Sequence, residues 1–177
     1  VGLGRDTNAL LEISKKTDIQ IAAGCGLFGH DSLPEKYASW STEQIYEWML
    51  DEIQNGIEST SAKPGIIGEI GTSEKIYPIE EKSLLAAAKA HVASGLPVML
   101  HTYPWTDAGL QAAKLLIENG VAPNKLCVCH VDVTFSIKLL AKLLSLGVFI
   151  EFDNFGKEFE FEAQAGAFAG GPFETDA

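Results

Sequence analysis

The chain of 177 residues has the length of one domain, and its 46% of hydrophobic residues can form a substantial core. Its formal net charge of −11 argues against nucleic acid, which is bound by clustered basic surfaces. No apolar run approaches the ~20 residues of a membrane span, so we expect a soluble protein that binds neither nucleic acid nor membrane.

A regular alternation of strands and helices is predicted along most of the chain. Short apolar runs bounded by glycine or polar residues read as buried strands, and the segments between them carry apolar residues at helical spacing. The predicted strands are Ile19–Ala23, Ile66–Ile70, Val98–His101, Leu126–His130 and Val148–Phe152. The predicted helices cover residues 7–17, 41–56, 79–94, 108–118 and 135–144. This order predicts an α/β fold with a parallel sheet and right-handed crossovers.

Two predicted helices begin at residues that favour capping. Thr7 is expected to cap the first helix. Ser41, with Gln44 three positions later, is typical of a capping box. Residues 27–39 are predicted as a loop, in which we expect His30 to be solvated rather than to bind a ligand.

Three predicted strands end on residues that can bind a metal ion: Glu69, His101 and His130. Their spacings of 32 and 29 residues (101 − 69 and 130 − 101) are close to the ~30 residues of a strand–helix–strand unit. Carboxyl ends of parallel strands meet at one edge of a sheet, and zinc binds imidazole nitrogen and carboxylate oxygen. The sequence therefore predicts a catalytic divalent metal site, with zinc as the expected ion. The alternative is a surface carboxylate and two histidines in ordinary core hydrogen bonds.

Strand alternation predicts which face each candidate ligand shares with its neighbours. It places Glu69 with Ile67, His101 with Met99, and His130 with Leu126 and Val128. Cys127 and Cys129 would then face the helices, pointing the same way from successive pleats, where they cannot easily pair. Because three cysteines are an odd number, a reducing compartment is the simpler interpretation, and we expect a cytoplasmic protein.

Further polar and aromatic residues follow the same strand ends. Asp153 could bind the metal, orient a ligand histidine or accept a proton, and Asp132 has the same options. Simple loop capping is the alternative for both aspartates. Tyr103 and Trp105 could line a substrate pocket, although aromatic residues at the mouth of a barrel often serve packing alone.

Several motifs together resemble the phosphotriesterase-related branch of the amidohydrolase superfamily. In order, they are GLGRD, AKPGIIGEIGTSE, PIEEKSLLAAAKAH, SGLPVMLHT, GVAPNKLCVCHVD and GVFIEFDNFGK, from Val1 to about Lys157. The resemblance implies a (β/α)8 TIM barrel with a two-metal centre at the carboxyl ends of its strands. The five predicted strands would be about the third to the seventh of that barrel.

The resemblance also implies roles for individual residues. Glu69 would bridge the two metals, in the place of a carboxylated lysine, and His101 and His130 would bind the more exposed metal. Asn154 and Val133 fall where typical members carry a relay histidine and its acidic partner, so a proton relay is not expected. The family's His-x-His pair and the metal-binding aspartate of its eighth strand have no counterpart in the sequence.

The function expected on this basis is that of a phosphotriesterase-like metal-dependent hydrolase with a catabolic role. A metal-activated hydroxide would attack an ester, lactone, amide or phosphoester in a small-molecule substrate. A lactone or amide is preferred to a phosphotriester because Glu69 marks the divergent branch. The alternative is a non-catalytic metal-binding or interaction fragment, because most ligands of the second metal are missing.

The predicted domain organisation is a barrel segment over residues 1–157 followed by an irregular tail over residues 158–177, rich in Ala, Gly and Phe. A barrel that lacks three strands exposes two sheet edges and apolar surface. We therefore expect either a piece of a longer protein, consistent with a start at Val1 rather than Met, or an incomplete domain that associates, for example as a homodimer.

Overall fold

Five parallel strands form one sheet in the computed structural model, which describes residues 4–133 and 136–155. The strands are β1 (Gly24–Cys25), β2 (Ile66–Gly71), β3 (Val98–His101), β4 (Leu126–Val128) and β5 (Phe149–Ile150). They are hydrogen-bonded in the order β1-β2-β3-β4-β5, and each neighbouring pair is parallel. Spatial order thus follows chain order, as in the wall of a (β/α)8 barrel, and the predicted parallel sheet is confirmed.

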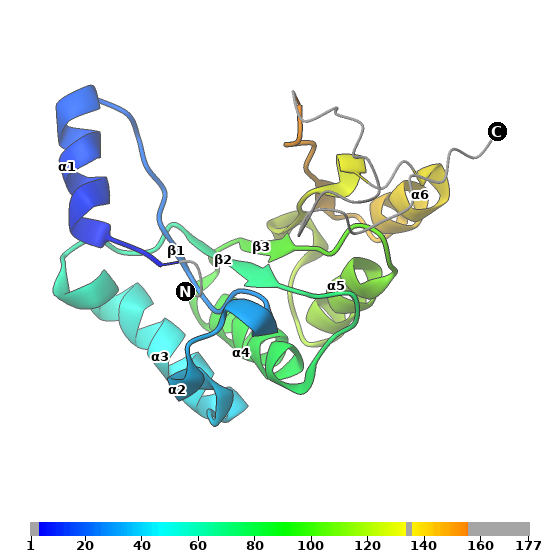
Figure 1. The fold of residues 1–177 in the computed structure, drawn as a ribbon, viewed down its shortest axis with the longest axis horizontal. Coiled ribbons are helices and arrows are strands. Elements are labelled where there is room, and N and C mark those ends of the chain that lie inside the picture. Colours follow the sequence, from blue (N-terminus) through cyan, green and yellow to red (C-terminus); the bar gives the residue numbers. More distant parts are fainter. Residues whose placement is uncertain (1–3, 134–135, 156–177) are drawn as a thin grey trace, which may run out of the picture.

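Helices connect the strands and cover one face of the sheet. They are α1 (Thr7–Thr17), α2 (Glu35–Ala38), α3 (Thr42–Asn55), α4 (Pro78–Ser94), α5 (Ala108–Glu118) and α6 (Ile137–Ser145). Short 3-10 turns occupy His30–Ser32, Ile57–Ser59, Pro123–Lys125 and Val131–Val133. Figure 1 shows α3, α4 and α5 along the same side of the strands, while α1 stands apart from them. Within the described residues, no helix is long and apolar enough to cross a membrane.

The hydrophobic core lies between the sheet and these helices. Along β3, Val98 and Leu100 are fully buried, whereas Met99 and His101 are half-exposed. Leu84 of α4 belongs to the same buried cluster as the two buried β3 residues. One face of the sheet is therefore packed against helices, and the other is half-exposed, as expected for part of a barrel whose interior faces inward from all its strands.

The first strand differs from the prediction. Ile19–Ala23 is not a strand, and Ile19 is 57% exposed. Pairing with β2 begins instead at Gly24, where a Cβ would lie 2.0 Å from the carbonyl oxygen of Gly68. Only glycine permits this close approach of two backbones, so the glycine-containing segment, rather than the more apolar run before it, joins the sheet.

The helix boundaries were predicted more accurately than this strand. Ser41 and Gln44 form the expected capping box of α3, whereas α1 is capped by Asp6 and not by Thr7. The Asp6 carboxylate accepts a hydrogen bond from the Ala9 amide at 2.9 Å, and the Thr7 hydroxyl is engaged elsewhere. The loop predicted over residues 27–39 contains α2. The predicted helix start at Phe135 and the tail over residues 158–177 lie outside the described residues.

A mostly buried ion pair ties the N-terminal segment to the sheet and to α3. Arg5 donates to the Glu52 carboxylate through both terminal nitrogens, at 2.5 and 3.1 Å, and to the carbonyl oxygen of Gly24 at 2.8 Å. The side chains of Arg5 and Glu52 are 11% and 6% exposed. Such a bidentate contact fixes the position of the segment that precedes α1.

His30 is not the solvated loop histidine that was expected. Its Nδ1 lies 2.8 Å from the Ser73 hydroxyl, and its ring stacks on Tyr77 with 3.6 Å between centroids. The buried carboxylate of Glu80 accepts hydrogen bonds from the His30 amide and the Ser73 hydroxyl. These contacts fasten the loop after β1 to the loop after β2, next to the carboxyl edge of the sheet.

Candidate metal centre

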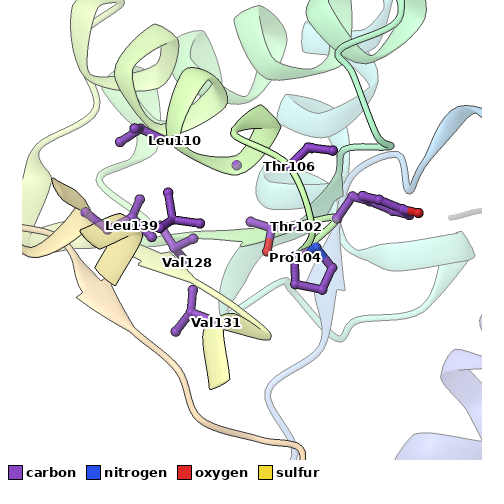
Figure 2. Close-up of a pocket in the computed structure, with 10 residues that line it drawn as sticks. Thr102, Pro104, Thr106, Leu110, Val128, Val131 and Leu139 are labelled. Carbon is purple, nitrogen blue, oxygen red and sulfur yellow. The ribbon is translucent and has the colours of Figure 1, made fainter. Parts of the chain in front are cut away.

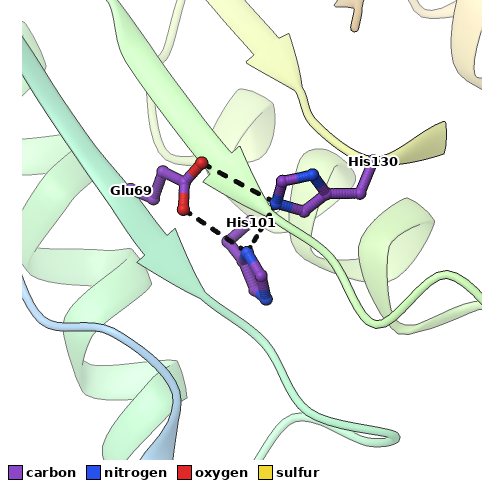
Figure 3. Close-up of side chains that lie close together, drawn as sticks. All are labelled: Glu69, His101 and His130. Atoms are coloured by element: carbon purple, nitrogen blue, oxygen red, sulfur yellow. Dashed lines mark hydrogen bonds and ion pairs between the residues drawn. The ribbon is translucent and has the colours of Figure 1, made fainter. Parts of the chain in front are cut away.

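Glu69, His101 and His130 converge at the carboxyl edge of the sheet, as predicted (Figure 3). His130 Nε2 lies 2.7 Å from His101 Nδ1. The two Glu69 oxygens lie 3.4 Å from His101 Nδ1 and 3.7 Å from His130 Nε2. All three side chains are half-buried, so their ligand atoms are accessible without being fully solvated.

Glu69 reaches the centre through an irregularity in β2. The register with β3 shifts between Ile67 and Ile70, and Gly68 has a φ of 142°. A Cβ at Gly68 would lie 2.4 Å from the carbonyl oxygen of Met99, so the two strands approach too closely there for any other residue. Ile67 is fully buried, while Glu69 points to the centre, so simple alternation does not relate these two residues and that prediction is wrong.

His130 also departs from strand alternation. Its φ of 63° is left-handed, a conformation that non-glycine residues adopt rarely and often at functional sites. Val128, two residues earlier, is fully buried and faces the helices, where it lines a small cavity of about 10 Å³ with Leu110 and Leu139 (Figure 2). The prediction that His130 shares a face with Val128 and Leu126 is therefore wrong.

The prediction that Cys127 and Cys129 face the helices is also wrong. Because Leu126 and Val128 are the buried, helix-facing residues of β4, Cys127 lies on the opposite, half-exposed face with Met99 of β3. Cys129 is fully buried but continues the Cys127 side of the strand. All three cysteines lie within the described residues and are free.

Asp153 orients His130. Its Oδ2 lies 2.7 Å from His130 Nδ1, and because an ionised carboxylate can only accept, the imidazole donates its Nδ1 proton. In a neutral ring this leaves the Nε2 lone pair directed toward His101 and Glu69. This geometry matches the second of the predicted options for Asp153, orientation of a ligand histidine.

Asp132 and Asn154 are joined by two hydrogen bonds. Asp132 accepts hydrogen bonds from the Asn154 amide at 2.8 Å and from its Nδ2 at 2.9 Å. Burial opposes ionisation of Asp132, but the hydrogen bonds from Asn154 outweigh it and lower the pKa of the carboxyl. Asn154 Nδ2 also donates to Asp153 Oδ1 at 2.9 Å, so the pair supports the loop that carries Asp153.

One aromatic residue packs against the centre, and sequence reasoning missed it. Phe28 packs against His101 with 4.3 Å between ring centroids. Its position just after β1, at the same edge of the sheet, was the available signal. Tyr103 and Trp105 pack edge-to-face on each other at 5.1 Å, and the buried Trp105 Nε1 has no partner among the described residues. Their predicted role in lining a substrate pocket remains a prediction.

The charges at the centre favour an ionised Glu69. A hydrogen bond with His101 lowers the pKa of the Glu69 carboxyl. Partial burial opposes this effect, and His101 and His130 reinforce it through their charge when they are protonated. The centre therefore presents one carboxylate and two imidazoles, the donor set of many zinc sites.

The distances between the donor atoms can be compared with those around a tetrahedral zinc ion. Bonds of about 2.0–2.1 Å imply donor separations of about 3.3 Å. The separations of 3.4 Å (Glu69 Oε2 to His101 Nδ1) and 3.7 Å (Glu69 Oε1 to His130 Nε2) are each close to this value, but they involve different carboxylate oxygens, so a single ion requires a small rotation of the carboxylate or contacts with both oxygens. The two imidazole nitrogens, 2.7 Å apart, need to separate slightly and release the proton that they share. The residues thus fit a divalent cation with small adjustments.

The fold is a parallel sheet with crossover helices, and it carries a Glu-His-His cluster at its carboxyl edge. These features are typical of α/β barrel proteins, which bind ligands at the ends of their strands. A family model described as "Phosphotriesterase family" matches residues 1–166, and the chain belongs to this family.

Known relatives agree with this assignment. The phosphotriesterase homology protein of Escherichia coli (strain K12) is 38% identical over 156 residues, which cover 88% of this chain and 53% of the relative. Its crystal structure, complexed with phosphate in the active site, superposes with a TM-score of 0.85 over 89% of this chain and 55% of that chain. The prediction of a partial (β/α)8 barrel is thereby confirmed.

Two further relatives carry the names of hydrolases. The human N-acetyltaurine hydrolase is 34% identical over 158 residues, 89% of this chain and 45% of the relative. The aryldialkylphosphatase of Saccharolobus solfataricus is 30% identical over 156 residues, 88% of this chain and 50% of the relative. The chain thus spans about half the length of the curated relatives it matches.

Proposed function

We propose that the complete protein is a metal-dependent hydrolase of a small-molecule substrate and that Glu69, His101 and His130 bind its metal. The observation that carries this proposal is the convergence of three side chains, from β2, β3 and the segment just after β4, with ligand atoms 2.7–3.7 Å apart. Membership of a family whose relatives are named as hydrolases supports it.

Each residue has a distinct task in this proposal. His101 offers Nδ1 and His130 offers Nε2 to the cation, and Asp153 keeps the His130 ring in the required tautomer. The two oxygens of Glu69 lie toward different histidines, so the carboxylate can also bridge to a second ion. A bound divalent ion lowers the pKa of a coordinated water and polarises a carbonyl or phosphoryl oxygen.

We propose zinc as the metal because two imidazoles and one carboxylate are typical zinc ligands. Two ions are proposed in the complete protein. The second would need ligands in addition to this cluster, to which Glu69 could contribute one oxygen, since the described residues hold one Glu-His-His cluster. A single weakly bound ion would instead support a non-catalytic metal-binding fragment, and the number of ions bound at this centre separates these alternatives.

For the substrate we propose an ester, lactone, amide or phosphoester, with an amide or lactone ahead of a phosphotriester. The name of the human relative, a hydrolase of an N-acyl compound, supports an amide. The name of the Saccharolobus solfataricus relative keeps a phosphoester among the candidates. Tyr103 and Trp105, which follow β3 at the edge that carries the centre, are proposed to contact the substrate.

The proposal is tested by measuring hydrolysis of one ester, one lactone, one N-acyl amide and one phosphotriester by the complete protein, before and after removal of metal. Chelation is expected to abolish the activity and zinc to restore it. Glu69→Gln and His101→Asn are each expected to lower kcat/KM at least 100-fold, whereas Glu12→Gln, a surface change on α1, should leave it unchanged. Undiminished activity in the metal-free protein would refute the proposal.

A further inference from the structure

A second cluster of metal-binding residues lies at the β4–β5 edge of the sheet. Cys127, Cys129 and Glu151 each offer one ligand atom, and these atoms all lie within 4.8 Å of one another. The cluster shares no residue with the Glu69, His101 and His130 centre and has a different chemistry, because two of its three donors are sulfur.

The pairing of β4 with β5 explains why these residues meet. Val128 is the register partner of Ile150, and the Glu151 amide donates to the carbonyl oxygen of Val128 at 2.9 Å. The next residues, Cys129 and Glu151, therefore lie side by side, and registered partners in a parallel sheet present their side chains on the same face. Cys127, two residues before Cys129, lies on that face as well.

Burial and charge also favour a cation at this cluster. Cys129 is fully buried, whereas Cys127 and Glu151 are partly exposed on the face of the sheet that forms the inside of a complete barrel. The charged side chains that act on Cys127 are Glu151 and Asp153, both of which are acids. Glu151 also acts on Cys129, through a hydrogen bond and through its charge. Acidic groups thus gather here without a cationic side chain among those that act on the thiols.

We propose that Cys127, Cys129 and Glu151 form a second binding site, for a thiophilic divalent cation such as zinc or cadmium. Sulfur ligands select such ions over magnesium or calcium, and three protein donors leave a fourth position for water. Binding forms two metal–sulfur bonds and one metal–oxygen bond. It releases two thiol protons to solvent and involves no change in oxidation state.

The test is a titration of the metal-free, fully reduced protein with Co²⁺, followed by thiolate-to-cobalt charge-transfer absorption in the near ultraviolet. Histidine and carboxylate ligands do not produce this band, so the readout is specific to the sulfur site. We expect a band that saturates when one Co²⁺ per chain is bound at the sulfur cluster; Co²⁺ bound at the Glu69, His101 and His130 centre does not contribute to it. It should be lost in Cys129→Ser, and about tenfold more Co²⁺ should be needed in Glu151→Gln.

Two controls make the result specific. Cys25→Ser, which changes a buried cysteine on β1, should keep the band. Glu69→Gln should keep it too, although it weakens the other centre, so failure of the proposed hydrolase and failure of this site can be told apart. If circular dichroism shows that Cys129→Ser does not fold, Cys127→Ser replaces it as the test variant.

Three outcomes would overturn the inference. The first is the absence of the sulfur band in the folded parent protein. The second is a band that persists unchanged in both Cys127→Ser and Cys129→Ser. The third is a Cys127–Cys129 disulfide, detected by mass spectrometry as a loss of two hydrogens, that persists under the reducing conditions of the titration.

Discussion

Replacement of Asp153 by Asn tests whether this carboxylate prepares His130 for a metal. The Oδ2–Nδ1 distance of 2.7 Å is that of a charge-assisted hydrogen bond. Loss of such a partner of a ligand histidine typically weakens metal binding by about 10- to 100-fold. The side chains of Asp153 and His130 are 30% and 20% exposed, so solvent screens part of the interaction. We therefore expect the lower end, a loss of about tenfold or about 1.4 kcal/mol.

The measurement is isothermal titration of zinc into the metal-free protein, for the parent and for Asp153→Asn, each carrying Cys129→Ser so that the sulfur cluster does not contribute. Asp31→Asn is a matched control, because Asp31 also contacts a histidine, His30 Nε2 at 2.9 Å, but is 90% exposed and belongs to a different loop. Its affinity should stay within about twofold of the parent. The reasoning fails if Asp153→Asn binds zinc as tightly as the parent, or if both variants lose the same affinity.

Three further predictions concern the fold that supports the centre. Gly68→Ala forces a Cβ to within 2.4 Å of the Met99 carbonyl oxygen and should lower the free energy of unfolding in urea by about 2 kcal/mol or more. Glu52→Gln leaves the buried Arg5 without its main carboxylate partner and should cost about 3 kcal/mol in the same assay. In the metal-free protein, the pKa of Glu69 is lowered, so its ionised form stabilises the fold above the usual glutamate pKa of about 4.3. This contribution is lost as the pH falls through the lower folded-state pKa. Glu69→Gln should remove this part of the pH dependence of stability.

Each of these predictions has a control in which the same change is made where the structure tolerates it. Gly29→Ala places a Cβ at an ordinary 3.6 Å from Glu80 and should change stability by less than about 0.5 kcal/mol. Glu43→Gln removes the partner of Lys89 in an exposed ion pair and should cost no more than about 1 kcal/mol. Glu12→Gln should leave the pH dependence intact. Equal effects in a variant and its control would contradict the corresponding prediction.

The candidate centre could be predicted from the sequence because its three residues are tied to strand ends. The spacing between Glu69, His101 and His130 reflects the length of a strand, a crossover helix and the next strand. This local rule requires no knowledge of packing. The capping box at Ser41 was predictable for the same reason, since its residues contact each other within one helical turn.

The positions that were predicted wrongly depend on contacts between strands. Alternation assumes a regular backbone, but β2 is irregular at Gly68, where it approaches Met99, and His130 adopts a left-handed conformation. A periodic pattern contains no sign of either deviation. For the same reason the apolar pattern predicts a strand over Ile19–Ala23, although the close approach of Gly24 to Gly68 sets the pairing.

The sequence by itself determined the order of the elements, the parallel sheet and the three residues at its carboxyl edge, because hydrophobic period and spacing are local properties of the chain. Only the tertiary structure decided that Asp153 orients His130, that Phe28 packs on His101 and that Glu151 lies beside Cys129. These contacts join residues from neighbouring strands and loops, and their geometry follows from strand register and backbone approach, which no single segment encodes.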